Sequence, residues 1–485
     1  MSSSDSNTHA GEAVVVKEEV SSPATEMEAG SVPPAMLHPA ILNTIAHHIG
    51  SVSVHHEVAG SSSSLAAAPS VPEPPAATTL VWAPLPLGVR DFMWHCAAAL
   101  DAGNVAAVNA FLLAMSCLAS ADGDPTQRVA FAFAEALGRR ALHVMLPGLS
   151  WALQHQLAGQ QPPPAPACAA ARRYFDALCP FLRVAASAAN HAIAAATEGD
   201  RFVHVVDLGG AGADQWLGLL RLLAARPEGA PPPFLRLSVV SEQEEFLCHA
   251  AGTLTQEAVR LHVPFVFNPV RSHIDRLSAA PGVAAALGED PREALVITST
   301  LQLHRLIADE ASAAPPHQMT RADELLRALR DLSPKLVVLT EQEADHNSGG
   351  LSDRVGNAFD YYSALFGDLE AGAGAPRASA ERAAVERLVL REEIMDIVAR
   401  EGSSRRERHE RMASWAQRMG VAGFEPAPAM RHNVFDAELL ALQWGADGTL
   451  RYWVREEDAN VVVYAGVTTP VFSVTAWRPA RMTGN

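Results

Sequence analysis

The residues best suited to cofactor chemistry lie in one short stretch, residues 203–216, with the sequence Val-His-Val-Val-Asp-Leu-Gly-Gly-Ala-Gly-Ala-Asp-Gln-Trp. A β-branched run ends at Asp207, a glycine-rich turn follows it, and a leucine-rich helical pattern begins at Trp216. Such a turn allows close backbone approach to a nucleotide, and the N-terminus of the following helix favours anionic groups. The stretch therefore predicts the first strand, turn and helix of a Rossmann-type domain.

The same turn is only partly suited to a methyl-donor cofactor. Gly209, Gly210 and Gly212 are present, but alanines occupy positions 211 and 213, where the usual alternation calls for glycine, and each added Cβ narrows the turn. Glu242 follows the second predicted strand, where an acid can accept hydrogen bonds from ribose hydroxyls. We therefore expect a vestigial pocket with no bound cofactor, whose candidate residues are Asp207, the three glycines, Glu242, His346 and Asn347.

A second polar group follows the fifth predicted strand, in the order Thr-Glu-Gln-Glu-Ala-Asp-His-Asn at residues 340–347. Acids beside His346 and Asn347 could perform acid–base chemistry or hold a ligand in a cleft. The simpler interpretation, which we prefer, is that these residues cap the next helix and tie loops together. His204 lies within an apolar strand and is expected to be a hydrogen-bonded core residue. No catalytic base and no metal-binding cluster is evident at the other strand ends.

The elements that must position these residues follow an α/β pattern. Nearly continuous apolar runs are typical of parallel strands covered on both faces. Five such runs alternate with helical segments, and three more, separated by tight turns, suggest an antiparallel end to the sheet. This order predicts a methyltransferase-like Rossmann core. The eight predicted strands are residues 202–208, 234–240, 265–268, 295–298, 335–340, 450–455, 461–465 and 471–477.

Helical patterns fill much of the remaining sequence. Residues 88–198 predict an N-terminal α-helical cap, with helices near 92–102, 105–118, 126–142 and 169–195. Residues 351–419 predict a second long helical stretch. Within it, residues 400–411 interleave arginine with glutamate, which favours a solvated helix face with i,i+4 ion pairs. Single leucine stripes on other helices are expected to be core, and a docking face is expected mainly on the cap.

The N-terminal region has a different composition. Residues 1–80 contain eight acids, one base, clusters of Ser and Pro, and no aromatic residue. Such a segment cannot bury enough apolar surface to offset its chain entropy. We therefore predict a disordered tail over 1–85, in which residues 36–49 form a short helix on a partner, followed by a folded domain over 86–485. That domain divides into a largely helical part, 86–200, and an α/β core, 201–485.

Charge and cysteine content limit the function classes. Removing the tail's one base and eight acids from the chain's 37 and 54 leaves 36 bases and 46 acids, a net charge of −10. This argues against a domain that grips duplex DNA by itself, because phosphate neutralisation needs a basic surface. Five cysteines without a CxxC pair favour buried thiols in a reducing compartment. No signal peptide or membrane span is evident.

Several ordered motifs resemble those of the GRAS family of plant transcriptional regulators, and in particular its scarecrow-like branch. The resemblance covers residues 88–479, with two alanine-diluted leucine-rich regions around the central motif. Thr475 stands where a serine is usual, and the acidic N-terminal signature of the DELLA branch is lacking. The motif residues are Val203, His204, Val205, Val206 and Asp207, then Pro334, Phe359, Tyr361, Arg391 and Glu392, and finally the run 405–410 with Trp415, Ala476 and Trp477.

The resemblance implies a nuclear regulator that acts through protein contacts in gibberellin response or in root and developmental control. Its implied partners are other transcription factors and other GRAS proteins, as a homo- or heterodimer, with mainly indirect contact to DNA and none to membranes. It implies no catalytic residue, cofactor or metal. Two alternatives stay open: an S-adenosylmethionine-dependent methyltransferase, and a factor that binds a specific DNA sequence directly.

A modification site is also predicted in the tail. Lys17 follows three valines and precedes two glutamates, a spacing that resembles the acceptor consensus for the small ubiquitin-like modifier. It is one of only two lysines in the chain, the other being Lys335.

Overall fold

The computed structural model describes residues 88–157, 164–226, 231–277, 290–307, 319–372, 379–427, 451–457, 460–466 and 468–481. The predicted disordered tail, the predicted short helix at 36–49 and the predicted modification site at Lys17 lie outside these residues.

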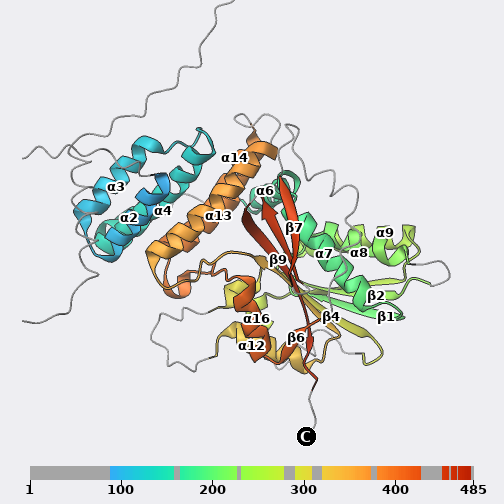
Figure 1. Cartoon of the computed structure of the whole chain (residues 1–485). Helices are drawn as coiled ribbons and strands as arrows, with labels where there is room; N and C mark the ends of the chain where they lie inside the picture. Colours follow the sequence, from blue (N-terminus) through green and yellow to red (C-terminus); the bar gives the residue numbers. More distant parts are fainter. Residues whose placement is uncertain are drawn as a thin grey trace, which may run out of the picture. The chain divides into compact units, whose positions relative to one another are not determined.

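A single sheet of nine strands forms the core of the described residues, in the order β3-β2-β1-β4-β5-β9-β8-β7, with β6 pairing to β9 (Figure 1). The first five strands pair in parallel, and β9, β8, β7 and β6 join by antiparallel pairing. The strands are β1 Phe202–Asp207, β2 Phe234–Val240, β3 Phe265–Val270, β4 Ala294–Thr300, β5 Leu336–Gln342, β6 Phe424–Pro426, β7 Tyr452–Glu457, β8 Asn460–Ala465 and β9 Thr469–Pro479.

All eight predicted strands are present, and the methyltransferase-like Rossmann core is confirmed. The antiparallel end is larger than the sequence indicated, because β6 is an additional strand. Only three residues long, Phe424–Pro426 offers too short a period-2 pattern to be recognised before its pairing with β9 is known.

The central strands β4 and β5 are buried on both faces, and their alternate residues enter different cores. Val296 and Val338 contribute to the core that includes α7 Phe181–Ala196, α8 Ala213–Ala224 and α9 Glu244–Arg260. Their neighbours Ile297 and Val337 contribute to the core that includes α12 Arg321–Asp331 and α16 Met412–Val421. The two groups of helices lie on opposite sides of the strands in Figure 1.

The helical cap begins with four helices: α2 Val89–Asp101, α3 Val105–Leu118, α4 Pro125–Met145 and α5 Pro147–Leu157. Asp124 starts α4 with a reciprocal capping box to Gln127, which satisfies two orphan backbone donors. Helices from later in the chain complete this layer, because α13 Leu351–Gly372 packs on α2 and α4 (Figure 1). Phe133 and Phe359 meet edge to face there, with ring centroids 5.4 Å apart.

The prediction of a single helix over 169–195 is wrong, because the structure has two helices there, α6 Ala165–Leu178 and α7. Proline at position 180 lacks a backbone N–H and ends the first pattern. Helix α7 contacts β5, β8 and β9, so it covers the sheet rather than extending the cap.

The prediction that residues 400–411 form a solvated helix face is also wrong. The long stretch 351–419 is broken into α13, α14 Ala380–Val385, a π-helical turn η4 Glu386–Leu390, α15 Arg391–Ala399 and α16. Only a 3-10 turn, Gly402–Ser404, occupies the arginine-rich segment, and residues 405–411 are not helical. Five of its charged or polar side chains are buried: Arg405, Glu407, Arg408, His409 and Glu410. Distant partners, described below, satisfy their charges.

The expectation of buried thiols has a mixed outcome. Cys96 and Cys179 are buried as predicted, but Cys117 and Cys248 are exposed. Leu220 and Leu329 are buried, as expected of core stripes. None of the described helices combines the length and apolar character needed to cross a bilayer.

Candidate functional site

The glycine turn after β1 is packed against the protein's own chain. Gly209 and Gly210 have φ values of 114° and 90°, a conformation that side-chain-bearing residues rarely adopt. A Cβ on Gly210 would overlap the carbonyl oxygen of Thr300 and lie 2.9 Å from Nε2 of Gln302. The close approach that glycine allows is therefore used by the chain that leaves β4.

Backbone hydrogen bonds fix this arrangement. Leu208 N–H donates to the Thr298 carbonyl at 2.8 Å, and Thr300 N–H donates to the Gly209 carbonyl at 3.2 Å. Gly212 has negative φ and open space around its Cα, so glycine is not required there. Glycine is therefore required at positions 209 and 210, where the turn packs against other parts of the chain.

Asp207 and Glu242, the two acids assigned to the vestigial pocket, lie in opposite environments. Asp207 is fully buried and accepts a hydrogen bond of 2.9 Å from Gly209 N–H, so it braces the turn. Burial raises the pKa of its carboxyl to about 7 despite that bond. Glu242 is half exposed and lies 3.5 Å from the exposed guanidinium of Arg276 on α10 Ile274–Leu277.

A second site lies at the carboxyl ends of β4 and β5. The chain leaves β4 through Leu301, whose φ of 55° is unusual for a bulky residue, and enters the 3-10 turn η2 Leu303–Leu306. Glu341 on β5 accepts hydrogen bonds from Leu303 N–H and from His304 Nδ1, at 2.9 and 2.7 Å. Strand β5 therefore holds the η2 turn through one carboxylate.

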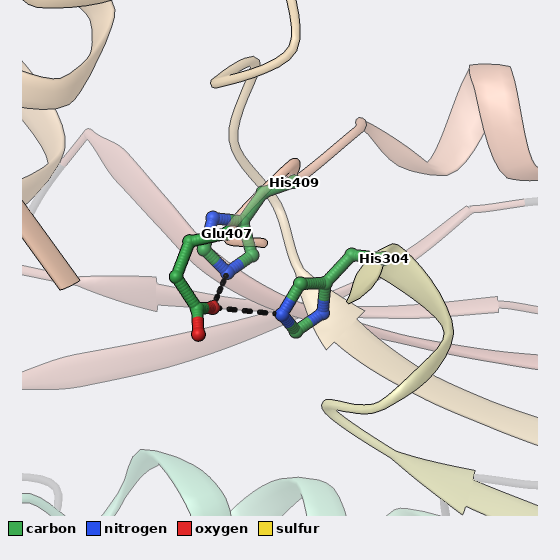
Figure 2. Close-up of side chains that lie close together, drawn as sticks. All are labelled: His304, Glu407 and His409. Atoms are coloured by element: carbon green, nitrogen blue, oxygen red, sulfur yellow. Dashed lines mark hydrogen bonds and ion pairs between the residues drawn. The ribbon is translucent and has the colours of Figure 1, made fainter. Parts of the chain in front are cut away.

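The other nitrogen of His304 faces residues 405–410. His304 Nε2 donates to Glu407 Oε2 at 2.8 Å, and Arg305 donates to Glu407 Oε1 at 2.8 Å. Figure 2 shows His304 facing Glu407, with His409 on the same side of the carboxylate. Backbone N–H groups at positions 406 and 407 donate to Asp396 Oδ1 at 2.7 and 2.8 Å. The segment is thus bound at both its backbone and its side chains.

The charges of this site are mutually stabilised. Burial alone would lower the pKa of His304, but Glu341 and Glu407 outweigh it and raise the pKa to about 9. Burial would raise the pKa of Glu407, but hydrogen bonds from His304 and His409 hold it well below its ordinary value. His304 is therefore an imidazolium between two carboxylates.

His346 and Asn347 join the same segment from the loop after β5. The Nδ1 atoms of His346 and His409 lie 2.9 Å apart, so one ring donates a hydrogen bond to the other. Burial lowers the pKa of both rings, to about 4 for His409, and leaves them neutral. Asn347 donates to Glu410 at 2.9 Å. These contacts join the loop after β5 to residues 405–410, which is the loop-tying role that we expected for His346 and Asn347.

Most of the remaining motif residues lie in the packed interior. His204 is buried, as expected, with Nε2 2.8 Å from Ser238 Oγ. Trp477 Nε1 donates to Thr475 Oγ1 at 2.8 Å, so the residue that replaces the usual serine keeps its hydroxyl bonded. The other buried members are Val203, Val205, Val206, Pro334, Phe359, Tyr361, Trp415 and Ala476.

Arg391 and Glu392 are the motif residues that reach a surface hollow. Arg391 pairs with Glu135 and lies over the ring of Phe131, 5.2 Å from its centroid. With Arg139, Arg387 and others, they line a cleft of about 460 Å³ beside α4, α6, η4 and α15.

Three residues of the second site, His304, Glu407 and His409, were missed as a group. They are separated by up to 105 positions, and only the fold brings them together. No local signal marks them as a group, because Glu407 and His409 lie in a run that has the pattern of an exposed helix.

Comparison with known proteins gives the class of the chain. The model of the GRAS domain family matches residues 89–478. The chain belongs to the GRAS domain family, and the resemblance read from its motifs is confirmed.

Its relatives share most of the folded region. Scarecrow-like protein 3 of Arabidopsis thaliana is 35% identical, over 79% of this chain and 87% of that protein. GRAS family protein TF80 of Medicago truncatula is 30% identical, over 79% and 93%. The DELLA protein RGL3 of Arabidopsis thaliana is 34% identical, over 79% and 68%.

A solved structure supports the same assignment. The crystal structure of SCL7 in Oryza sativa superposes with a TM-score of 0.66 at 30% identity, covering 80% of this chain and 99% of that chain. The fold class and the class of plant transcriptional regulator, with relatives in gibberellin and developmental signalling, are thereby established.

Proposed function

We propose that this protein is a nuclear transcriptional co-regulator that works through protein contacts and performs no catalysis. Other transcription factors, including other GRAS proteins, are its partners, in homo- or heterodimers, and its contact with DNA is mainly indirect. Gibberellin response or root and developmental control is its context. A relative named chitin-inducible gibberellin-responsive protein 2 from Oryza sativa, 31% identical over 70% of the chain, supports that context.

The filled glycine turn is the observation that carries the non-catalytic part of this proposal. Methyl-donor cofactors require the backbone of this turn to face the ligand. Here Gly210 faces Thr300 and Gln302 instead, and Glu242 pairs with Arg276. The turn that would hold such a cofactor is therefore engaged within the chain, whereas Glu242 has only a solvent-exposed ion pair.

The cap offers a surface for protein contacts. Where α4 ends and α5 begins, four large apolar side chains are exposed, and Trp151 among them is 65% exposed. Exposed apolar groups with an aromatic member are typical of interaction sites. The four residues, here called the α4–α5 patch, are Val144, Leu146, Leu149 and Trp151.

A reporter assay tests the regulatory role. We expect the full chain, fused to a heterologous DNA-binding domain, to change transcription from the cognate promoter in plant protoplasts. The substitutions Leu149→Ser and Trp151→Ser should reduce that change at equal nuclear protein level. Val259→Ser is the matched control, because Val259 is 71% exposed on α9, outside the patch. An unchanged reporter with the wild-type chain would contradict the proposal.

Direct DNA binding is the second candidate function, and the arginine-containing cleft is the feature that favours it. Arg139, Arg387 and Arg391 line the cleft, but Glu135 and Glu392 line it too, and Arg391 is already paired. We therefore expect the purified chain to show no sequence preference for DNA in salt titrations. Preferred binding to one sequence, weakened by Arg387→Glu, would instead establish the second candidate.

A further inference from the structure

Three potential metal-ligand atoms converge within the second site. His304 Nε2, Glu407 Oε2 and His409 Nε2 all lie within 4.8 Å of one another. Glu407 Oε2 is 2.8 Å from the first nitrogen and 3.3 Å from the second. Figure 2 shows both ring nitrogens directed at that oxygen. Neutral imidazole and carboxylate are the donors that zinc uses most often besides thiolate.

The far side of each of these groups is held by another residue. His304 Nδ1 bonds to Glu341 Oε2 at 2.7 Å, and Glu407 Oε1 bonds to Arg305 at 2.8 Å. His409 Nδ1 lies 2.9 Å from His346 Nδ1. Metal-binding histidines almost always have their second nitrogen fixed in this way, commonly by a carboxylate. The orientation of each potential ligand is thus fixed by a second contact.

Hydrogen bonds alone engage the three atoms unequally. One proton between His304 Nε2 and Glu407 Oε2 makes a hydrogen bond of 2.8 Å, while the fully buried His409 Nε2 lies 3.3 Å from the same oxygen. A single cation at the centre engages all three atoms.

We propose that His304, Glu407 and His409 bind one divalent transition metal ion of the zinc type. On binding, the proton shared by His304 and Glu407 is released to solvent, His409 keeps its proton on Nδ1 and donates it to His346 Nδ1, and the ion takes lone pairs from both Nε2 atoms and from Oε2. Three protein ligands leave one tetrahedral position for a water molecule. The ion joins the η2 turn to the segment 405–411, which are far apart in sequence, and so fastens the C-terminal motif to the sheet.

The wild-type chain provides the first test. Full-length protein is stripped with a chelator, and Zn²⁺ is added in a titration calorimeter. We expect one ion per chain, retained through desalting, and a higher thermal unfolding midpoint in the loaded protein. Co²⁺ in place of Zn²⁺ should give the intense visible absorption of a tetrahedral site. If no ion is retained and the unfolding midpoint does not shift, the proposal is overturned, and His304 and Glu407 share a proton instead.

Variants locate the ion. Glu407→Gln and His409→Ala should each abolish retention, and Glu341→Gln should weaken Zn²⁺ affinity about 10- to 100-fold, because Glu341 orients a ligand without touching the ion. His249→Ala is the matched control, since His249 is an exposed histidine on α9. Circular dichroism identifies any variant that fails to fold, and the Co²⁺ spectrum of the wild type then decides. Retention unchanged in folded His409→Ala would place the ion elsewhere and overturn the proposal.

Discussion

Two places at the carboxyl edge of the same sheet are filled by the chain in different ways. After β1, the backbone of Gly209 and Gly210 packs against the end of β4, with the uncharged Gln302 beside it. After β4 and β5, charged side chains of His304, Glu341 and Glu407 form one buried network. Rossmann-type domains commonly bind ligands at this edge. In this protein both places bind other parts of the chain.

The difference shows what each place can tolerate. The turn depends on the absence of side-chain atoms, so an added methyl group should damage it. The network depends on matched charges, so removing one partner should damage it. Substitutions at the two places should therefore lower the free energy of unfolding by different amounts.

Glu407→Ala should have the largest effect, because it leaves the buried His304 and the partly buried Arg305 without their shared carboxylate. Removing one member of a buried ion pair typically lowers the free energy of unfolding by about 3–5 kcal/mol. Urea unfolding followed by circular dichroism measures this. The control Glu392→Ala removes an exposed acid and should change the value by less than about 0.5 kcal/mol. Equal effects for the two variants would mean that the network contributes nothing.

Gly210→Ala should lower the free energy of unfolding by about 2–3 kcal/mol, because its Cβ would meet the Thr300 carbonyl and its φ of 90° is strained for alanine. Gly212→Ala should be neutral or slightly stabilising, since it has open space and negative φ. Urea unfolding of the two variants side by side measures the contrast. If both glycines tolerate alanine, the turn is not packed as the structure shows.

Asp207→Asn should change the pH dependence of stability. The pKa of Asp207 is raised by burial to about 7, so the folded chain holds this proton more tightly than the unfolded chain does. The stability that the bound proton contributes is fully present below about pH 4 and is lost as pH rises toward 7. Between about pH 5 and pH 7.5, wild-type stability should therefore fall by about 2–3 kcal/mol more than that of the variant. Parallel curves from urea unfolding would show that the carboxyl titrates normally.

Gln302→Ala should have the smallest effect, about 1 kcal/mol or less, because the side chain makes one long hydrogen bond, of 3.4 Å, to Thr300 O. The backbone of the turn should remain closed, since the bonds from Leu208 and Thr300 are independent of this side chain. Amide hydrogen exchange at residues 208–210 checks this. Faster exchange there by orders of magnitude would show that Gln302 itself holds the turn shut.

The sequence revealed local features well. The turn at 207–212 was recognised because strand, glycines and helix are adjacent, and the parallel strands were recognised because both of their faces are apolar. The cap was also recognisable from helical spacing, apart from the break at proline 180.

The network was not recognisable, because its residues meet only after folding. Residues 400–411 resemble an exposed helix, since alternating arginine and glutamate has the same local pattern whether partners are near or distant. Asp396 accepts from the backbone at 406 and 407, and the segment therefore leaves the helical path. Only the three-dimensional arrangement distinguishes a buried charge network from a solvated one.

Calorimetry with S-adenosylmethionine tests most directly whether the carboxyl edge of the sheet serves internal bonding in place of cofactor binding. We predict no binding heat for the wild-type chain and none for Gln302→Ala, because Thr300 still occupies the space that Gly210 faces. Micromolar binding by the wild-type chain, abolished by Asp207→Ala in a folded protein, would contradict this account and favour an enzyme.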